Sequence, residues 1–129
     1  MREEVYKWLQ QAFDDLATAK DMVATGHYYA AAFWAQQSAD KALKALALSL
    51  GKVLRTHDLS EILNTIHEES GLPIDDVKQD ANKLTIHYVV SRYPNAANAI
   101  PSRIYSRDDA EDLVRRAEKV IQWVRQNLR

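Results

Sequence analysis

The chain has 129 residues, a length that favours a single domain, residues 1–129, with one hydrophobic core. Its hydrophobic content of 47% and charged content of 27% are those of a folded globular protein. The formal charge of −1 leaves no overall field for a polyanion, so nucleic-acid binding requires a local basic patch. The absence of cysteine excludes disulfides and thiolate metal sites, and no apolar stretch approaches the roughly 18 residues of a membrane span, so we expect a soluble cytoplasmic domain.

Three glycines divide the chain into helices. Gly26 and Gly51 each follow an amphipathic run, and Gly71 comes two residues before Pro73. Glycine is favoured just past a helix end because it adopts the left-handed conformation without a Cβ clash. No strand pattern and no internal repeat is present, so the chain is predicted to be all-α.

The first two predicted helices span residues 3–25 and 27–50. In the first helix, apolar residues recur at alternating spacings of four and three, which places them on one face. The second helix is rich in alanine on the face that it is expected to bury. Small side chains let helix backbones approach closely, so we expect tight packing of this helix against a neighbour.

The remaining helices begin at capping residues. Asp58, with a glutamate three residues later, has the pattern of a capping box that opens a short third helix. Pro73 suits the first turn of a fourth helix, which Pro94 ends, and residues 94–105 are expected to form a loop. Ser106, followed by acidic residues, starts the last helix. The predicted fold is an up-and-down four-helix bundle with a short additional helix.

Metal and nucleophilic chemistry have no signature in this sequence. The four histidines, His27, His57, His67 and His87, lack the i, i+4 spacing of a helical zinc pair. There is also no cysteine, no Gly-x-Ser-x-Gly elbow and no glycine-rich phosphate loop. We therefore predict no metal site and no catalytic residue of these classes.

A polar face on the second helix is the first candidate site. Gln37, Lys41 and Lys44 follow the i, i+4, i+7 spacing and project together, and Asp40 is expected to pair with Lys44. A solvated face with one weak ion pair accounts for the same pattern equally well.

Apolar side chains outside the predicted core predict a partner surface. Phe33, Trp34 and Leu48 share the outer surface of the second helix, and Trp123 lies outside the core stripe of the last helix. Grouped apolar residues of this kind are typical of protein interfaces, most simply those of a homodimer.

Residues at two helix boundaries form a second candidate site. His57, just before a helix, either helps Asp58 to cap that helix or contacts a phosphate near the lysines. Arg92 either binds the last carbonyls of its own helix or acts with Tyr93 on a nucleotide. In the second case the guanidinium binds phosphate in a bidentate manner and the phenol ring stacks on a base.

Four segments carry a resemblance to a known family: Gly26–Ala31, Gln36–Ala45, Thr56–Leu59 and Arg92–Asn95. In this order and approximate spacing they resemble the HEPN family, named for higher eukaryotes and prokaryotes nucleotide-binding. The resemblance covers nearly the whole chain and implies an up-and-down helical bundle that usually dimerises. Small prokaryotic members are commonly encoded beside a minimal nucleotidyltransferase, so the resemblance also implies a complex with such an enzyme, as in a toxin–antitoxin module.

The resemblance further implies a nucleotide or partner site. Its residues are those of both candidate regions: Gln37, Lys41, Lys44, His57, Arg92 and Tyr93. The implied ligand is a nucleotide such as ATP or GTP, or an RNA, with no other cofactor. Lys41, Lys44 and Arg92 would meet phosphate charge, whereas Tyr93 would stack and His57 would orient one contact.

Other branches of the HEPN family are metal-independent ribonucleases, which use an arginine and a histidine separated by about four to six residues. This chain has no such pair, and the nearest substitute is Lys83 with His87. These two residues belong, with Asp80 and Ser91, to a polar ridge that is more typical of a solvated face. A ribonuclease acting through Arg92 and a histidine, His57 or His87, is therefore the alternative function, and a dimeric scaffold is the third.

Overall fold

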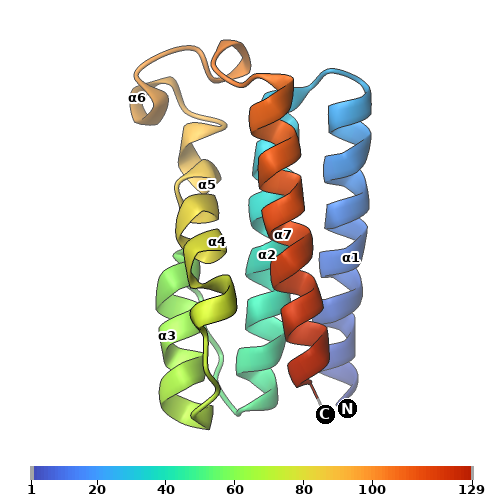
Figure 1. The fold of residues 1–129 in the computed structure, drawn as a ribbon, viewed down its shortest axis with the longest axis vertical. Coiled ribbons are helices and arrows are strands. Elements are labelled where there is room, and N and C mark those ends of the chain that lie inside the picture. The colour runs from blue at the N-terminus through green and yellow to red at the C-terminus, as the bar shows by residue number, and fades with distance from the viewer. Residues whose placement is uncertain (1, 129) are drawn as a thin grey trace.

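The computed structural model describes residues 2–128 and shows an up-and-down helical bundle (Figure 1). Three long helices run side by side: α1 (Glu3–Ala24), α2 (Tyr28–Ser49) and α7 (Arg107–Asn127). Two shorter helices complete the bundle: α3 (Leu59–Ser70) and α4 (Asp75–Thr85). The connection from α4 to α7 contains three helical turns: α5 (His87–Val90), α6 (Pro94–Ala97) and the 3-10 helix η1 (Pro101–Arg103). No strand occurs within residues 2–128, which confirms the predicted all-α fold, and none of these helices is long and apolar enough to cross a membrane.

Most helix boundaries lie where the capping pattern predicts them. Gly71 has φ +74° directly after α3, and the other two glycines are also in the left-handed region. The Asp58 carboxylate accepts the backbone N–H groups of Ser60 and Glu61 at the start of α3. Ser106 and Asp109 form a reciprocal capping box at the start of α7.

Three boundary predictions differ from the structure. α4 begins at Asp75 with Ile74 at its N-cap, so Pro73 precedes this helix instead of opening it. The predicted fourth helix is interrupted at Ile86, where α4 gives way to α5. The predicted loop 94–105 contains α6 and η1, because a proline begins each of these short turns without the loss of a needed N–H donor.

The core is built around α2, which contacts α1, α7, α3 and α5. Six alanines of α2 have no exposed surface, and this lets the neighbouring helices approach closely, as predicted: Ala31, Ala32, Ala35, Ala39, Ala42 and Ala45. Larger buried side chains come from α3, α4 and α7. The remaining side of α2 carries the first candidate site.

Candidate nucleotide and partner site

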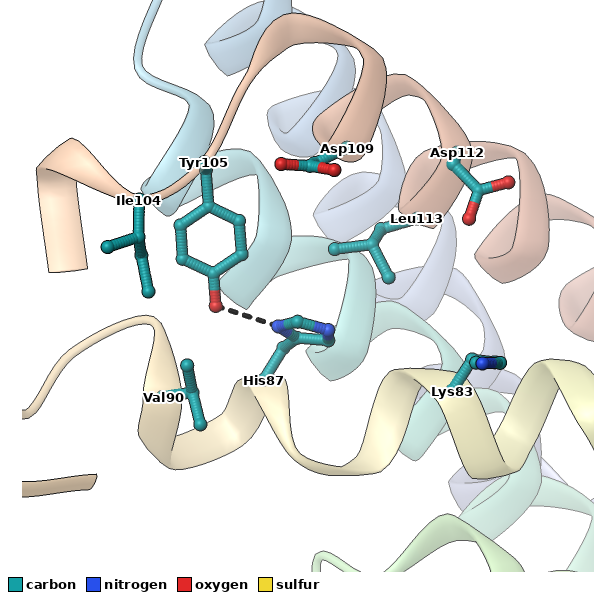
Figure 2. A pocket seen from close by; sticks show the side chains of 8 residues that line it. All are labelled: Lys83, His87, Val90, Ile104, Tyr105, Asp109, Asp112 and Leu113. Carbon is teal, nitrogen blue, oxygen red and sulfur yellow. Dashed lines mark hydrogen bonds between the residues drawn. The ribbon is translucent and has the colours of Figure 1, made fainter. Parts of the chain in front are cut away.

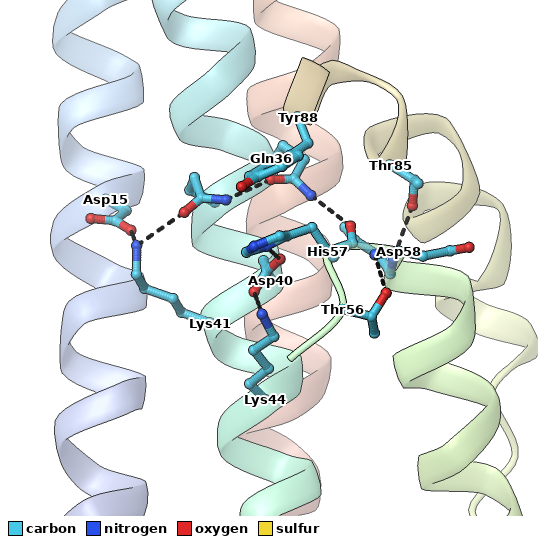
Figure 3. A network of polar contacts seen from close by, with 12 residues as sticks. Asp15, Gln36, Asp40, Lys41, Lys44, Thr56, His57, Asp58, Thr85 and Tyr88 are labelled. Atoms are coloured by element: carbon cyan, nitrogen blue, oxygen red, sulfur yellow. Dashed lines mark hydrogen bonds and ion pairs between the residues drawn. The ribbon is translucent and has the colours of Figure 1, made fainter. Parts of the chain in front are cut away.

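The turn before α3 brings His57 onto the middle of α2 (Figure 3). The Gln36 amide donates to the His57 carbonyl at 3.0 Å, and Nδ1 of the His57 ring lies 2.9 Å from Oδ2 of Asp40. Donation of the Nδ1 proton to this carboxylate fixes the tautomer of the ring. Nε2 is then an acceptor when the ring is neutral and a donor when it is charged. The side chain is 39% exposed, so a ligand can reach it.

Asp40 is the buried centre of this arrangement. The carboxylate is only 2% exposed, and its second oxygen, Oδ1, lies 2.7 Å from the Lys44 ammonium. The predicted Asp40–Lys44 pair is therefore present, but the interpretation of a weak, solvated pair is wrong. Lys44 is 8% exposed because the turn that carries His57 packs against this part of α2.

Lys41 points away from Asp40 and forms an ion pair with the buried carboxylate of Asp15 on α1. Gln37 connects the Lys41–Asp15 pair with the group around His57. Its side-chain carbonyl oxygen is 3.5 Å from the Lys41 ammonium, and its amide donates to the Gln36 side chain at 2.9 Å. The polar network thus runs from α1 across α2 to the turn that carries His57 (Figure 3). Each α2 lysine of the predicted site already has its own carboxylate partner.

An aromatic stack extends the site from His57 toward α5. The His57 ring stacks on Tyr88 with 4.0 Å between ring centroids and 15° between ring planes. The Arg92 guanidinium lies 4.4 Å from the Tyr88 centroid, 4.7 Å from that of Phe33 and 4.9 Å from that of Tyr93. Three aromatic faces therefore hold this cation in place.

Arg92 also contacts the end of its own helix. Its Nε donates to the Tyr88 carbonyl at 2.7 Å, so the predicted contact with a helix-end carbonyl is confirmed. Its terminal amino groups make no hydrogen bond to residues 2–128, and the side chain is exposed. They remain available to an anion, beside the Tyr93 ring, which is 48% exposed. The interpretation of His57 as a helix cap is wrong, since Asp58 alone caps α3 and the His57 ring contacts Asp40.

A separate cavity of about 290 Å³ lies between α5 and the start of α7 (Figure 2). Nδ1 of His87 lies 2.7 Å from the Tyr105 hydroxyl inside it. Burial lowers the pKa of His87 against a smaller opposing effect of the Asp109 carboxylate. Burial, and secondly the same carboxylate, raises the pKa of Tyr105 to about 12. Both groups are therefore neutral at neutral pH, and the phenol donates to the imidazole.

The predicted polar ridge on the fourth helix is divided between different environments. Lys83 and His87 line the cavity. Asp80 is buried and forms ion pairs with Arg116 at 3.1 Å and Lys119 at 3.2 Å. Ser91 is fully buried and donates to the His87 carbonyl. The interpretation of a solvated face is thus wrong for the aspartate and the serine.

A comparison with protein families decides the identity of the chain. The model of the HEPN domain matches residues 5–127. The chain belongs to the HEPN family. This confirms the predicted resemblance over nearly the whole length of the chain.

Solved structures agree with the HEPN assignment. TT1696 from Thermus thermophilus is 34% identical with a TM-score of 0.90, and the match covers 98% of this chain and 100% of that one. ST0689, described as an archaeal HEPN homologue, is 30% identical with a TM-score of 0.79 over 100% of both chains. Among curated proteins, "Putative toxin MJ1304" of Methanocaldococcus jannaschii is 28% identical over 134 residues, covering 95% of this chain and 86% of that protein.

The six predicted nucleotide-binding residues of the HEPN chain do not form one uniform surface. Arg92 and Tyr93 are adjacent and exposed, and Tyr88 links Arg92 to His57. Gln37 and Lys41 join this group through the polar network, whereas Lys44 lies behind Asp40. Their role in nucleotide binding stays a prediction.

Two residues of the site were missed by the sequence reasoning. The sequence predicts Asp40 only as the partner of Lys44 and does not predict Tyr88 as a site residue. The signal for Asp40 is weak, because its contact with His57 joins residues 17 positions apart and depends on the turn geometry. For Tyr88, placement between a histidine and an arginine cannot be read from spacing along the helix.

The four residues of the predicted partner surface lie in two different environments. Phe33, Trp34 and Leu48 lie on the outer side of α2 and are half-buried, with Phe33 and Trp34 edge to face at 5.1 Å. The expectation that Trp123 lies outside the core is wrong, since this side chain is 8% exposed and packs in the core. α7 contacts α1, α2 and α4, so its buried face is wider than a single apolar stripe.

Proposed function

We propose that this HEPN chain is a nucleotide-binding and interaction module. It forms a homodimer and pairs with a separate minimal nucleotidyltransferase in a toxin–antitoxin-like module. The similarity to "Putative toxin MJ1304" supports the toxin–antitoxin context. The observation that carries nucleotide binding is the exposed Arg92 guanidinium, held against three aromatic rings and linked by Tyr88 to an oriented histidine.

Each group has its own part in the proposed binding. The free amino groups of Arg92 bind a phosphate, since guanidinium and phosphate match in charge and in bidentate geometry. The exposed ring of Tyr93 offers a stacking face to a base. Nε2 of His57, oriented by Asp40, contacts a hydroxyl or phosphate oxygen. Lys41 and Lys44 act indirectly, by holding the carboxylates of Asp15 and Asp40.

Titration calorimetry with ATP, GTP and a short single-stranded RNA tests this proposal. We expect Arg92→Ala to weaken binding by at least about tenfold, because hydrogen bonds to charged groups contribute about 1.5–3 kcal/mol. Arg125→Ala is the matched control, since this arginine also lies near an aromatic ring, that of Phe13 at 5.8 Å, on another helix. No heat of binding with any of the three ligands would reject the nucleotide-binding role.

A metal-independent ribonuclease is the second candidate function. The observation that favours it is the cavity in which Lys83, neutral His87 and Tyr105 come together. With Nδ1 accepting the Tyr105 hydroxyl, the neutral imidazole carries its proton on Nε2, which can donate to a leaving oxygen, and the lysine can stabilise phosphate charge. Degradation of RNA in EDTA that His87→Ala abolishes would favour this function over binding alone, and intact RNA would dismiss it.

A further inference from the structure

Tyr88 lies between two of the groups proposed to bind a nucleotide. The His57 ring stacks on the Tyr88 ring with 4.0 Å between centroids and 15° between planes. The guanidinium carbon of Arg92 lies over the same ring, 4.4 Å from its centroid. Two flat groups at these distances cannot share one face of a ring, because each covers the face that it contacts. His57 and Arg92 therefore occupy opposite faces of Tyr88, in a stack of three groups.

A hydrogen bond ties Arg92 to the backbone of the same residue. Nε of Arg92 donates to the Tyr88 carbonyl at 2.7 Å. The guanidinium also lies 4.7 Å from the Phe33 centroid and 4.9 Å from that of Tyr93. Tyr88 thus fixes Arg92 through its carbonyl and its ring at once, and this arrangement leaves the terminal amino groups of the guanidinium for a ligand.

The helix that carries Tyr88 is not anchored by the core. None of the four residues of α5 is buried. Two adjacent side chains make its aromatic contacts with other elements. His87 contacts Tyr105, which precedes α7, and Tyr88 contacts Phe33 of α2 at 6.3 Å between ring centroids. The position of α5 beside α2, and with it that of Arg92 just after α5, therefore depends on the contacts of the Tyr88 ring.

These contacts use the ring and the carbonyl of Tyr88 and not its hydroxyl. The hydroxyl makes no hydrogen bond within residues 2–128. Phenylalanine at this position would keep both ring faces and the carbonyl. Leucine would keep the carbonyl and lose the ring faces. The two substitutions thus separate a role of the aromatic ring from a role of the backbone.

We propose that Tyr88 is a positioning residue of the nucleotide site and makes the contributions of His57 and Arg92 to binding interdependent. The hydrogen bond to Asp40 holds one nitrogen of the His57 ring but not the ring plane, which the stack on Tyr88 sets. The opposite face of Tyr88 sets the plane of the guanidinium. A change at either group is therefore transmitted to the other through one ring. The inference rests on the proposed nucleotide binding.

Titration calorimetry with ATP and a short single-stranded RNA tests this coupling. We expect Tyr88→Leu to weaken binding by about tenfold and Tyr88→Phe by less than about twofold, a coupling within the usual range for residues in contact. The losses caused by His57→Ala and Arg92→Ala should be non-additive in the wild-type chain and additive in a Tyr88→Leu chain. Tyr28→Leu is the matched control, because Tyr28 is also half-buried but contacts neither group of the stack within residues 2–128.

Proton NMR of His57 gives a readout that needs no ligand. A ring stacked at 4.0 Å lies in the shielding region of its partner. The ring protons of His57 should therefore move to higher chemical shift in Tyr88→Leu and stay in place in Tyr88→Phe and Tyr28→Leu. Unchanged signals in Tyr88→Leu would overturn the stack on which the inference depends.

The binding results separate failure of the inference from failure of the nucleotide function. Equal binding by the wild type and Tyr88→Leu would overturn the positioning role of Tyr88 and leave nucleotide binding intact. Additive losses for His57→Ala and Arg92→Ala in the wild-type chain would overturn the interdependence. Equal weakening by Tyr88→Phe and Tyr88→Leu would assign the effect to the hydroxyl and reject the stack as its cause. No binding of either ligand by the wild type would reject the nucleotide function, and the inference with it.

Discussion

Asp40 binds two basic side chains at once, so one buried carboxylate both stabilises the bundle and orients the candidate site. Its oxygens lie 2.7 Å from the Lys44 ammonium and 2.9 Å from the His57 imidazole. A charged lysine that is 8% exposed depends on such a partner, since an unpaired buried charge is strongly unfavourable. The orientation of His57 and the stability of α2 are therefore coupled.

Removal of this carboxylate should destabilise the protein strongly. We expect Asp40→Ala to lower the free energy of unfolding by about 3–5 kcal/mol, because the Lys44 ammonium is left buried without a counter-charge. Lys7→Ala, which breaks the exposed Glu3–Lys7 pair on α1, should change it by less than about 1 kcal/mol. Urea unfolding of both variants measures the difference. Similar losses of unfolding free energy in the two variants would contradict the conclusion that Asp40 neutralises a buried lysine.

His87 makes stability depend on pH in the mildly acidic range. Burial holds its pKa below the ordinary value of 6.5, so the unfolded chain takes up a proton at higher pH than the folded chain does. The free energy of unfolding should therefore fall as the pH drops below 6.5, and His87→Asn should reduce this fall. Urea titrations one pH unit above and one below 6.5 compare the two proteins. An unchanged pH dependence in the variant would contradict the buried, neutral ring.

Tyr105 should have the opposite effect at alkaline pH. Its pKa is raised from 10.0 to about 12, so between these values the unfolded chain loses the phenol proton and the folded chain keeps it. Stability should thus decrease as the pH rises above 10, and less so in Tyr105→Phe. Thermal unfolding followed by circular dichroism from neutral pH to pH 11 measures this decrease. An equal decrease in the variant would show that other groups cause it.

Short-range pairs were predictable from the sequence at the residue scale, and long-range contacts were not. The Asp40–Lys44 pair follows from i, i+4 spacing, but its burial depends on a turn beyond the end of α2. The stack of His57 on Tyr88 joins residues from different elements. The core position of Trp123 was mispredicted because α7 packs against three helices at once.

At the scale of elements, helix ends were more predictable than the connection between α4 and α7. Glycine, Asp58 and Ser106 act locally, through backbone conformation and side-chain caps, so their pattern identifies the ends of the long helices. The short turns α6 and η1 have four and three residues and no amphipathic period. Outside these two turns, the connection is held by contacts of the folded chain, such as the hydrogen bond between Tyr105 and His87 of α5.

The capping box at the start of α7 has a measurable effect on this helix. Ser106 accepts the Asp109 N–H at 3.0 Å, and the Asp109 carboxylate accepts the Ser106 N–H at 2.9 Å. We expect Ser106→Ala to lower the free energy of unfolding by about 1 kcal/mol, within the usual range of about 0.5–2 kcal/mol for such caps. Ser102→Ala, at an exposed position in η1, should change it by less than about 0.5 kcal/mol. Chemical denaturation of the two variants compares their free energies of unfolding. Equal losses in Ser106→Ala and Ser102→Ala would contradict a specific role of the cap.

At the scale of the whole molecule, α2 lies at the centre of the bundle, and three of its large apolar side chains keep some exposed surface. Phe33, Trp34 and Leu48 are half-buried on α2: Trp34 and Leu48 pack against the core, and Phe33 lies beside Tyr88 of α5. Trp8 of α1, which is 40% exposed, lines a shallow hollow of about 250 Å³ with Lys41 of α2. Apolar surface thus extends over both helices, with a polar network between them.

This surface should form the homodimer interface. We expect the chain to sediment as a dimer at tens of micromolar and Trp34→Ala to shift it toward monomer, since large aromatic residues dominate interface energetics. Tyr6→Ala is the exposed control on α1, with Tyr6 54% exposed, and should leave the dimer unchanged. Trp123→Phe should also leave it unchanged, because Trp123 packs inside the core and not on the outer side of α2. A wild-type monomer would remove the dimer from the proposed function, and a dimer lost only in Trp123→Phe would move the interface to α7.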